Sequence, residues 1–238
     1  MIHRLGIDSV PVDQSSNGRG GTADKWRLEP VPSAALALPL LFSTRLFLLA
    51  LILASTSGIR RHMLDAAGVV YEAVKPHVDE NAVKSRLTDA TEIAAELAGA
   101  KACSIAGSDW VIGSDSVVSV DGRLFGKPRD RDEAAEHLRF FSSKTMLLTS
   151  AVALALGAKL DWSHVETARL DVRPLSEAFI ADYLDAEWPE VGYTVGVFRL
   201  EGRGVQLFER IDGDHFTILG MPLIPLLGAL RARGVLPA

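Results

Sequence analysis

Segments with the pattern of β-strands and segments with the pattern of α-helices alternate along the chain from Leu48 onward. Strands are indicated by short apolar or alternating runs, and helices by apolar residues that recur at helical spacing. The expected strands cover residues 48–54, 69–74, 110–120, 146–156, 165–172 and 205–211. The expected helices cover residues 59–67, 91–106, 130–141, 176–184 and 223–233. This interleaving predicts an α/β fold rather than an all-β or all-α fold.

The first expected strand is the end of a longer apolar run, residues 34–54. That run is long enough for a membrane-spanning helix to be considered. Arg45 lies in the middle of the run and Pro39 lies in its first half, and both residues disfavour a spanning helix. Because buried parallel strands also read as continuous apolar runs, we interpret Leu48–Ala54 as such a strand. A membrane-anchored form of the protein is the alternative.

The segment before this strand differs in composition from the rest of the chain. Residues 1–47 contain four of the 11 prolines and the linker-like stretch Ser15–Gly21. We therefore expect residues 1–47 to form a poorly structured leader, and residues 48–238 to form one folded domain.

Charge and cysteine content restrict the partners of the protein. The formal net charge is −5, which argues against a nucleic-acid polymer as partner because proteins that bind one carry a basic excess. A few well-placed cations on an acidic protein can still bind a small anion. The one cysteine, Cys103, cannot form an internal disulfide. It fits a reducing compartment and is interpreted as a small packed residue.

Three polar clusters interrupt the apolar elements. Residues 55–61 follow the first strand, where hydroxyls, free helix N–H groups and arginines suit phosphate oxygens; an ordinary serine cap with solvated arginines is the alternative. Residues 113–116 place Asp115 inside an apolar strand, where a carboxylate needs a partner or a metal; a purely structural carboxylate is the alternative. Residues 126–128 hold Lys127 between glycine and proline, in a loop that could direct it at a phosphate.

In this order the clusters resemble the Maf family of nucleotide pyrophosphatases, once described as septum-formation inhibitors. The resemblance runs from about Leu48 to Leu236. The matching motifs are Leu53–Arg60, Val78–Glu80, Lys101–Ala102, Gly113–Asp115, Gly126–Pro128, Glu201–Gly204 and Gly220–Leu223. Each motif is short, and their number and order carry the resemblance.

The resemblance implies a fold of the Maf/ITPase type, in which a mixed sheet with helices forms two lobes around a nucleotide-binding cleft. It implies hydrolysis of a nucleoside triphosphate to the monophosphate and pyrophosphate, which keeps non-standard nucleotides from being incorporated. A divalent cation, Mg²⁺ or Mn²⁺, is implied as cofactor. A cytoplasmic homodimer is also implied, with no membrane as partner.

Roles for individual residues follow from the same resemblance. Asp115 matches the proton acceptor that activates the attacking water, and Asp115 and Glu80 match the carboxylates at the metal. Asp79, beside Glu80, is secondary. The phosphate chain is expected to bind Ser55, Ser57, Arg60, Lys101 and Lys127.

Four positions either differ from the family pattern or are expected to influence which base the protein binds. Gly58 stands where the family usually has proline, and Ile59 and Ser116 match neither the pyrimidine type nor the 7-methyl-GTP type. Glu201 matches the 7-methyl-GTP type, and its carboxylate can accept hydrogen bonds from the N1–H and 2-amino edge of a guanine. Glu201 favours a purine or modified-guanine substrate, while Ile59 and Ser116 leave the base specificity open. Because Gly58 and Ile59 degrade the first motif, a non-catalytic nucleotide-binding regulator of cell division is the alternative function.

Overall fold

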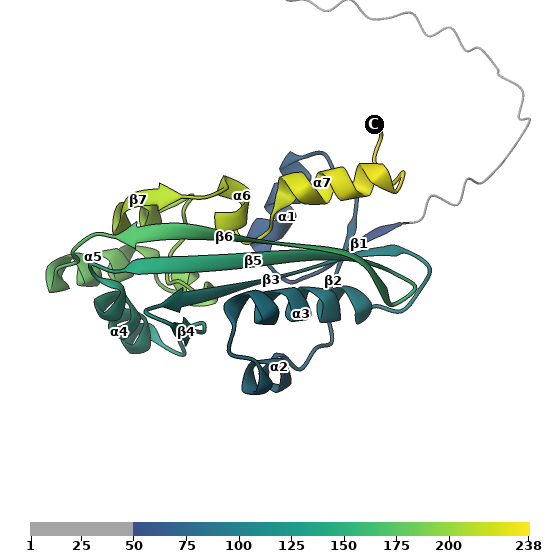
Figure 1. The fold of residues 1–238 in the computed structure, drawn as a ribbon. Coiled ribbons are helices and arrows are strands. Elements are labelled where there is room, and N and C mark those ends of the chain that lie inside the picture. Colours follow the sequence, from purple (N-terminus) through teal and green to yellow (C-terminus); the bar gives the residue numbers. More distant parts are fainter. Residues whose placement is uncertain (1–49) are drawn as a thin grey trace, which may run out of the picture. The chain divides into compact units, whose positions relative to one another are not determined.

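The computed structural model describes residues 50–238, which form a mixed seven-stranded sheet covered by helices (Figure 1). The strand order is β2-β1-β3-β5-β6-β7, and β4 pairs with β3. The strands are β1 (Leu51–Ala54), β2 (Glu72–Val74), β3 (Trp110–Val120), β4 (Arg123–Phe125), β5 (Thr145–Leu156), β6 (Lys159–Val172) and β7 (Phe208–Asp212). The mixed α/β fold predicted from the sequence is confirmed.

One edge of β3 is shared by two different strands. Strand β1 runs parallel to β3 and ends where Ala54 pairs with Gly113. Hairpin strand β4 runs antiparallel to β3 and begins to pair at Val118. Residues 114–117 of β3 therefore have β5 on one side and no strand on the other in the described part of the chain. This gap in the sheet, like the switch points of open α/β sheets, leaves room for a ligand.

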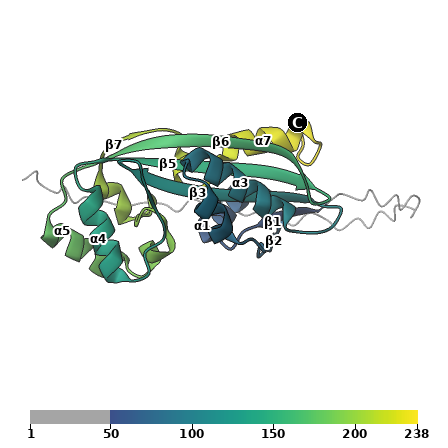
Figure 2. The same cartoon turned by 60° about the horizontal axis from the view of Figure 1, so that its bottom comes forward.

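The helices cover both faces of the sheet and one of its ends. They are α1 (Gly58–Ala66), α2 (Glu80–Arg86), α3 (Ala90–Cys103), α4 (Arg131–Phe141), α5 (Glu177–Glu187), α6 (His215–Ile218) and α7 (Leu223–Ala232). Helix α3 packs along one face, while α1 and α7 lie on the other (Figure 1). Helices α4 and α5 pack together at one end of the sheet (Figure 2).

The apolar core is divided along the sheet. One cluster joins the α4 and α5 end to β3, β5 and β6 around Phe141 and Leu170. A second cluster joins α1 and α7 to the opposite end around Leu53 and Leu230, and a third lies under α3. Helices α4 and α5 therefore pack their apolar residues against one end of the sheet, and α1 and α7 pack theirs against the other.

Capping explains most helix boundaries, including one that the sequence did not predict. The Asp130 carboxylate accepts the Glu133 N–H at 2.8 Å at the start of α4, as the sequence indicates. Helix α2 was not expected. It forms because the Asp79 carboxylate accepts the Ala82 N–H at 3.1 Å, which is the usual role of aspartate at a helix N-cap.

Several expected strands begin at other residues than predicted, among them β2, which begins at Glu72 rather than at residue 69. Strand β6 begins at Lys159 rather than at residue 165, because the tight turn at Gly157 and Ala158, both with positive φ, lets β5 and β6 pair along their whole length. The expected strand at 205–211 is wrong in its first half. There the chain forms a 3₁₀ turn over Arg203–Leu207, and β7 starts only at Phe208.

The described end of the apolar run is a strand, as predicted: Leu51–Ala54 is buried between β2 and β3. The predicted leader over residues 1–47 and the start of the predicted strand lie outside the described residues. Across residues 50–238, none of the helices has the length and apolar character needed to cross a membrane.

Candidate active site

A cavity of about 940 Å³ opens at the gap in the sheet, and every residue predicted for the site lines it. These residues are Ser55, Ser57, Ile59, Arg60, Glu80, Lys101, Asp115, Ser116, Lys127 and Glu201. They come from separate segments of the chain, so it is the fold that brings them together around one cavity. Asp79 caps α2 and is absent from the lining, in keeping with its secondary place in the sequence analysis.

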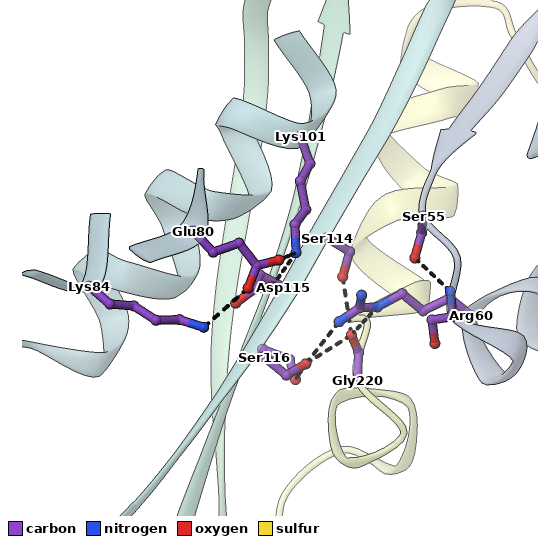
Figure 3. Close-up of polar contacts among 11 residues, drawn as sticks. Ser55, Arg60, Glu80, Lys84, Lys101, Ser114, Asp115, Ser116 and Gly220 are labelled. Carbon is purple, nitrogen blue, oxygen red and sulfur yellow. Dashed lines mark hydrogen bonds and ion pairs between the residues drawn. The ribbon is translucent and has the colours of Figure 1, made fainter. Parts of the chain in front are cut away.

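Lys101 joins the two candidate catalytic carboxylates (Figure 3). Its Nζ atom lies 2.6 Å from Asp115 Oδ1 and 2.7 Å from Glu80 Oε1. The side chains of Lys101 and Asp115 are buried, whereas that of Glu80 is 41% exposed. Lys101 comes from α3, and Glu80 comes from the first turn of α2. Asp115 comes from the stretch of β3 that pairs with β5 on one edge only. Three elements thus meet in one ionic bridge, which is buried at Lys101 and Asp115 and partly exposed at Glu80.

Glu80 is held in its charged form by two lysines. Partial burial would raise the pKa of Glu80, but hydrogen bonds and charge from Lys101 and Lys84 outweigh it and hold this pKa at about 2. Lys84, one helical turn after Glu80, contacts Oε2 at 3.1 Å. Lys84 was not predicted as a site residue, although its i, i+4 spacing from Glu80 is a signal for such a contact.

Arg60 is fixed on the opposite face of β3 by hydrogen bonds to the loop after α6. Its Nε donates to the Gly220 carbonyl at 2.9 Å, and one terminal nitrogen donates to Ser116 Oγ at 3.2 Å. Ser114 and Ser116 hydroxyls also donate to this carbonyl, both at 3.1 Å. Burial lowers the pKa of the Arg60 guanidinium, and the nearby carboxylates Asp115 and Glu80 oppose that shift. The remaining guanidinium hydrogens are available to an anion in the cavity.

The turn between β1 and α1 presents unpaired backbone donors. The Ser55 hydroxyl accepts the Ser57 N–H at 3.1 Å. Ser57 is the N-cap of α1, but its side chain makes no capping hydrogen bond. Ser57 therefore occupies the cap position without the hydrogen bond of an ordinary serine cap. Gly58, Ile59 and Arg60 of the first turn line the cavity, and N–H groups of a first helical turn have no intrahelical partner.

Lys127 completes the cationic side of the cavity. Burial lowers the pKa of Lys127, and so do the charges of Arg60 and Lys101, while Glu80 and Asp115 raise it. Five cations and four carboxylates line the cavity. The cations are Arg60, Lys84, Lys101, Lys127 and Arg199; the carboxylates are Glu80, Asp115, Glu190 and Glu201. A chain with net charge −5 thus gathers a small positive excess where a polyanion could bind.

The far end of the cavity is formed by the segment between α5 and β7. Tyr193, Phe198 and Leu200 contribute aromatic and apolar surface beside Glu201. The buried Glu187 carboxylate accepts from Arg199 at 3.2 Å and from the Arg203 N–H at 3.4 Å, so it holds the turn on both sides of Glu201. Tyr193 and Arg199 lie outside the motifs used above, and no sequence signal pointed to them.

The carboxylates present fit a magnesium-type ion rather than a closed protein cage. In residues 50–238 there is no group of three or more His, Cys, Asp or Glu side chains placed to hold a metal. Mg²⁺ is commonly held by one or two carboxylates together with substrate phosphates and water. Glu80 and Asp115 supply two such carboxylates. They line the same cavity as Arg60 and Lys127, which could bind the substrate phosphates.

Comparison with known proteins agrees with this geometry. The family described as "Maf-like protein" matches residues 50–233. A 7-methyl-GTP pyrophosphatase of Rhizobium meliloti (strain 1021) is 45% identical over 195 residues, covering 79% of this chain and 98% of that protein. A nucleoside triphosphate pyrophosphatase of Nitrobacter hamburgensis is 45% identical over 191 residues, covering 78% of this chain and 95% of that protein. One from Sphingopyxis alaskensis is 45% identical over 195 residues, with 79% and 98% coverage.

Proposed function

The chain belongs to the Maf family, and we propose that it is a hydrolase that cleaves a nucleoside triphosphate to the monophosphate and pyrophosphate. One observation carries this proposal. The cavity brings two lysine-bridged carboxylates, a strand-to-helix turn with free N–H groups, and a cluster of cations into one space. Hydrolysis of a phosphoanhydride needs such groups, because charge must be neutralised while water is positioned for attack.

Asp115 is the proposed proton acceptor. Lys101 occupies its Oδ1 atom, so the other carboxylate oxygen is the one we assign to the water. The water oxygen forms a bond to the α-phosphorus, and its proton passes to Asp115. The bond from the α-phosphorus to the oxygen that bridges the α- and β-phosphates breaks, and pyrophosphate leaves with that oxygen.

Arg60, Lys127 and the N–H groups that follow Ser57 are proposed to bind the phosphate chain. Arg60 is held in place by the Gly220 carbonyl, and such a fixed position lowers the entropy lost on binding. The Ser55 side chain, buried beneath the turn, fixes the path of the backbone through its bond to Ser57 N–H. These contacts stabilise the charge that moves onto the leaving pyrophosphate.

We assign Glu80 and Asp115 as the protein ligands of a divalent cation, Mg²⁺ or Mn²⁺. When bound, such an ion supplies charge neutralisation for the phosphate oxygens and a lower pKa for a coordinated water. No other carboxylate is needed, since the phosphates and water complete the coordination of such an ion.

Glu201 is proposed to select the base. It lines the far end of the cavity with the apolar and aromatic side chains of the same segment. A carboxylate accepts from the N1–H and 2-amino groups of guanine, which no pyrimidine offers together. We therefore propose a guanine nucleotide or its 7-methyl derivative as substrate, the latter being the substrate in the name of the Rhizobium meliloti relative. Ile59 and Ser116, which also line the cavity, are proposed to contribute to this choice.

A substrate panel with product analysis tests the activity. Purified protein with Mg²⁺ or Mn²⁺ is given GTP, 7-methyl-GTP, dTTP and UTP in ¹⁸O-labelled water. We expect pyrophosphate release with the label in the monophosphate, because water attacks the α-phosphorus. Asp115→Asn should lower kcat by about 10²–10⁴-fold, as expected for loss of a general base. Asp121→Asn, at an exposed hairpin position outside the cavity lining, is the matched control and should retain turnover.

The same panel tests the base assignment. Glu201→Gln should reduce the preference for guanine nucleotides over UTP by at least about tenfold, because an amide cannot accept both guanine hydrogens as a carboxylate does. Nucleotide binding without turnover across the panel would instead support the non-catalytic regulator of cell division. An unchanged preference in Glu201→Gln would remove Glu201 from the base site.

The cellular setting is also proposed from family membership. We propose a cytoplasmic homodimer that removes non-standard nucleotides before they are incorporated. The one cysteine, Cys103, is a free thiol in this fold, as a reducing compartment requires. Light scattering on the purified protein tests the dimer.

A further inference from the structure

The contacts of Lys101 point to a coupling between the binding of metal and the binding of nucleotide. Its ammonium group lies between one oxygen of Glu80 and one oxygen of Asp115, at 2.7 and 2.6 Å. These are the same two side chains to which the proposed function assigns the divalent cation. The charge that such an ion would neutralise is therefore neutralised by a lysine in this structure.

The ammonium and a divalent ion cannot share this position. An Mg²⁺ ion bound to Glu80 Oε1 and Asp115 Oδ1 would lie about 2.0–2.1 Å from each oxygen. Lys101 Nζ occupies the same space between those oxygens, and two cations in direct contact repel strongly in a buried site. Binding of the ion to these oxygens requires Lys101 to move away.

The second oxygen of Glu80 is not free either. Lys84 contacts Oε2 at 3.1 Å, so each oxygen of Glu80 has a lysine partner. Lys84 differs from Lys101 because its side chain is 44% exposed, against 9% for Lys101. Water can replace Lys84 at little cost, whereas a displaced and buried Lys101 needs another anionic partner.

The phosphate chain of a nucleotide is such a partner. Lys101 lines the same cavity as Arg60 and Lys127, so a bound phosphate lies within the same space. We propose that Lys101 acts as an electrostatic placeholder: it keeps divalent cations off the position between Glu80 Oε1 and Asp115 Oδ1 until a nucleotide arrives, so that metal and nucleotide bind together. The coupling is reciprocal, and the metal strengthens nucleotide binding by the same factor as the nucleotide strengthens metal binding. This inference rests on the proposed metal ligands.

Mn²⁺ titration followed by the electron paramagnetic resonance of the free ion tests the placeholder without using activity. For the wild type we expect weak Mn²⁺ binding alone and binding at least about tenfold tighter with an α,β-methylene GTP analogue. Lys101→Met should bind Mn²⁺ at least about tenfold tighter than wild type without nucleotide, because two carboxylates lose their competing cation. Lys84→Met, the matched control, should change Mn²⁺ affinity by no more than about twofold.

Two further measurements keep the result interpretable. Lys101→Arg retains the cation and should keep nucleotide-free Mn²⁺ binding weak, and the wild-type comparison with and without nucleotide needs no variant. Circular dichroism confirms that each variant is folded. Wild-type protein that binds Mn²⁺ equally well with and without nucleotide, or Lys101→Met that binds no tighter than wild type, would overturn the placeholder alone. No Mn²⁺ binding in any state would overturn the proposed metal site and the placeholder with it.

Discussion

At the scale of single residues, Gly58 stands where the family resemblance leads us to expect proline, and its surroundings are compatible with proline. Gly58 is the first residue of α1, and its φ lies outside the left-handed region. A Cβ atom added to it would meet nothing within 4 Å. The preceding residue, Ser57, has φ −68° and ψ 121°, which is the conformation favoured before proline.

Gly58→Pro should therefore stabilise the protein. Proline is favoured at the first position of a helix, where the lost N–H has no intrahelical partner. The expected gain is about 0.4–1 kcal/mol, which arises from a less flexible unfolded chain. For a protein of this size that gain raises Tm by about 1–4 °C, measured by differential scanning calorimetry.

The same variant reports on the phosphate turn. If the Gly58 N–H binds phosphate, Gly58→Pro should raise KM while Tm rises; if only later N–H groups bind, KM should stay unchanged. A lower Tm would contradict the interpretation of Gly58 as a relaxed proline position. Gly58→Ala, which retains the N–H, separates the two effects.

The site residues could be predicted from the sequence because each sits in a short motif at the end of an element. The contacts that join these residues to one another could not be predicted. The bridge from Lys101 to Glu80 depends on α2, a helix that the sequence pattern did not predict. Tyr193 and Arg199 reach the cavity from a segment without regular periodicity, so no pattern marks them.

At the scale of elements, the position of Lys101 depends on how closely α3 approaches β3. Gly113 makes this approach possible. A Cβ atom added to Gly113 would lie 2.1 Å from the Ala98 carbonyl oxygen and 2.4 Å from the Ala102 nitrogen, both of the α3 backbone. Asp115 follows two residues later on the same strand, so any outward shift of α3 separates Lys101 from it.

Gly113→Ala should destabilise the fold and weaken catalysis together. Overpacking against backbone costs about 1–3 kcal/mol, and the displaced helix carries Lys101 away from Asp115. Chemical denaturation measures the stability, and kcat on the best nucleotide measures the site. Full activity with unchanged stability would show that α3 does not need this contact.

Gly99→Ala is the matched control on the same helix. Its added Cβ would meet only the Leu160 side chain, at an ordinary 3.8 Å. Because alanine favours the helix interior over glycine, stability should rise by up to about 1 kcal/mol. The two substitutions, identical in chemistry, are expected to act in opposite directions.

Element boundaries show where local sequence patterns stop being sufficient. Helices with strong caps, such as α4 and α5, appear at the predicted positions because Asp130 and Ser176 supply local hydrogen bonds. Strand β6 starts earlier than predicted because its exposed first half lacks an apolar pattern and is formed by pairing with β5. Pairing of this kind is decided by the neighbouring strand, which local periodicity does not describe.

At the scale of the whole molecule, the cavity is lined by residues that belong to or pack against two different apolar clusters, one at each end of the sheet. Phe198 and Ile218 belong to the cluster at the α4 and α5 end, while Leu219 packs against the cluster under α1 and α7. All three line the cavity. Every residue described for the site lies between Ala54 and Gly220, within the described part of the chain.

A shortened chain of residues 48–238 should therefore retain the activity of the full-length protein. This start preserves Ala50, whose N–H donates to Asp109 at 3.0 Å and whose carbonyl accepts the Trp110 N–H at 3.1 Å. The two bonds hold the beginning of β1 against β3. We expect kcat/KM for the best nucleotide to match the full chain within about twofold, since no described contact of the site is lost.

A start at residue 55 is the informative comparison, because it differs only by removing β1. That strand lies between β2 and β3, and Leu53 and Ala54 are fully buried. Its loss leaves β2 without a partner and opens the core under α1, which costs more than the roughly 5–15 kcal/mol that stabilises a typical domain. Residues 55–238 should not fold, as judged by circular dichroism and hydrogen exchange. If they fold and hydrolyse nucleotide, or if residues 48–238 lose activity, the domain boundary proposed at residue 48 is wrong.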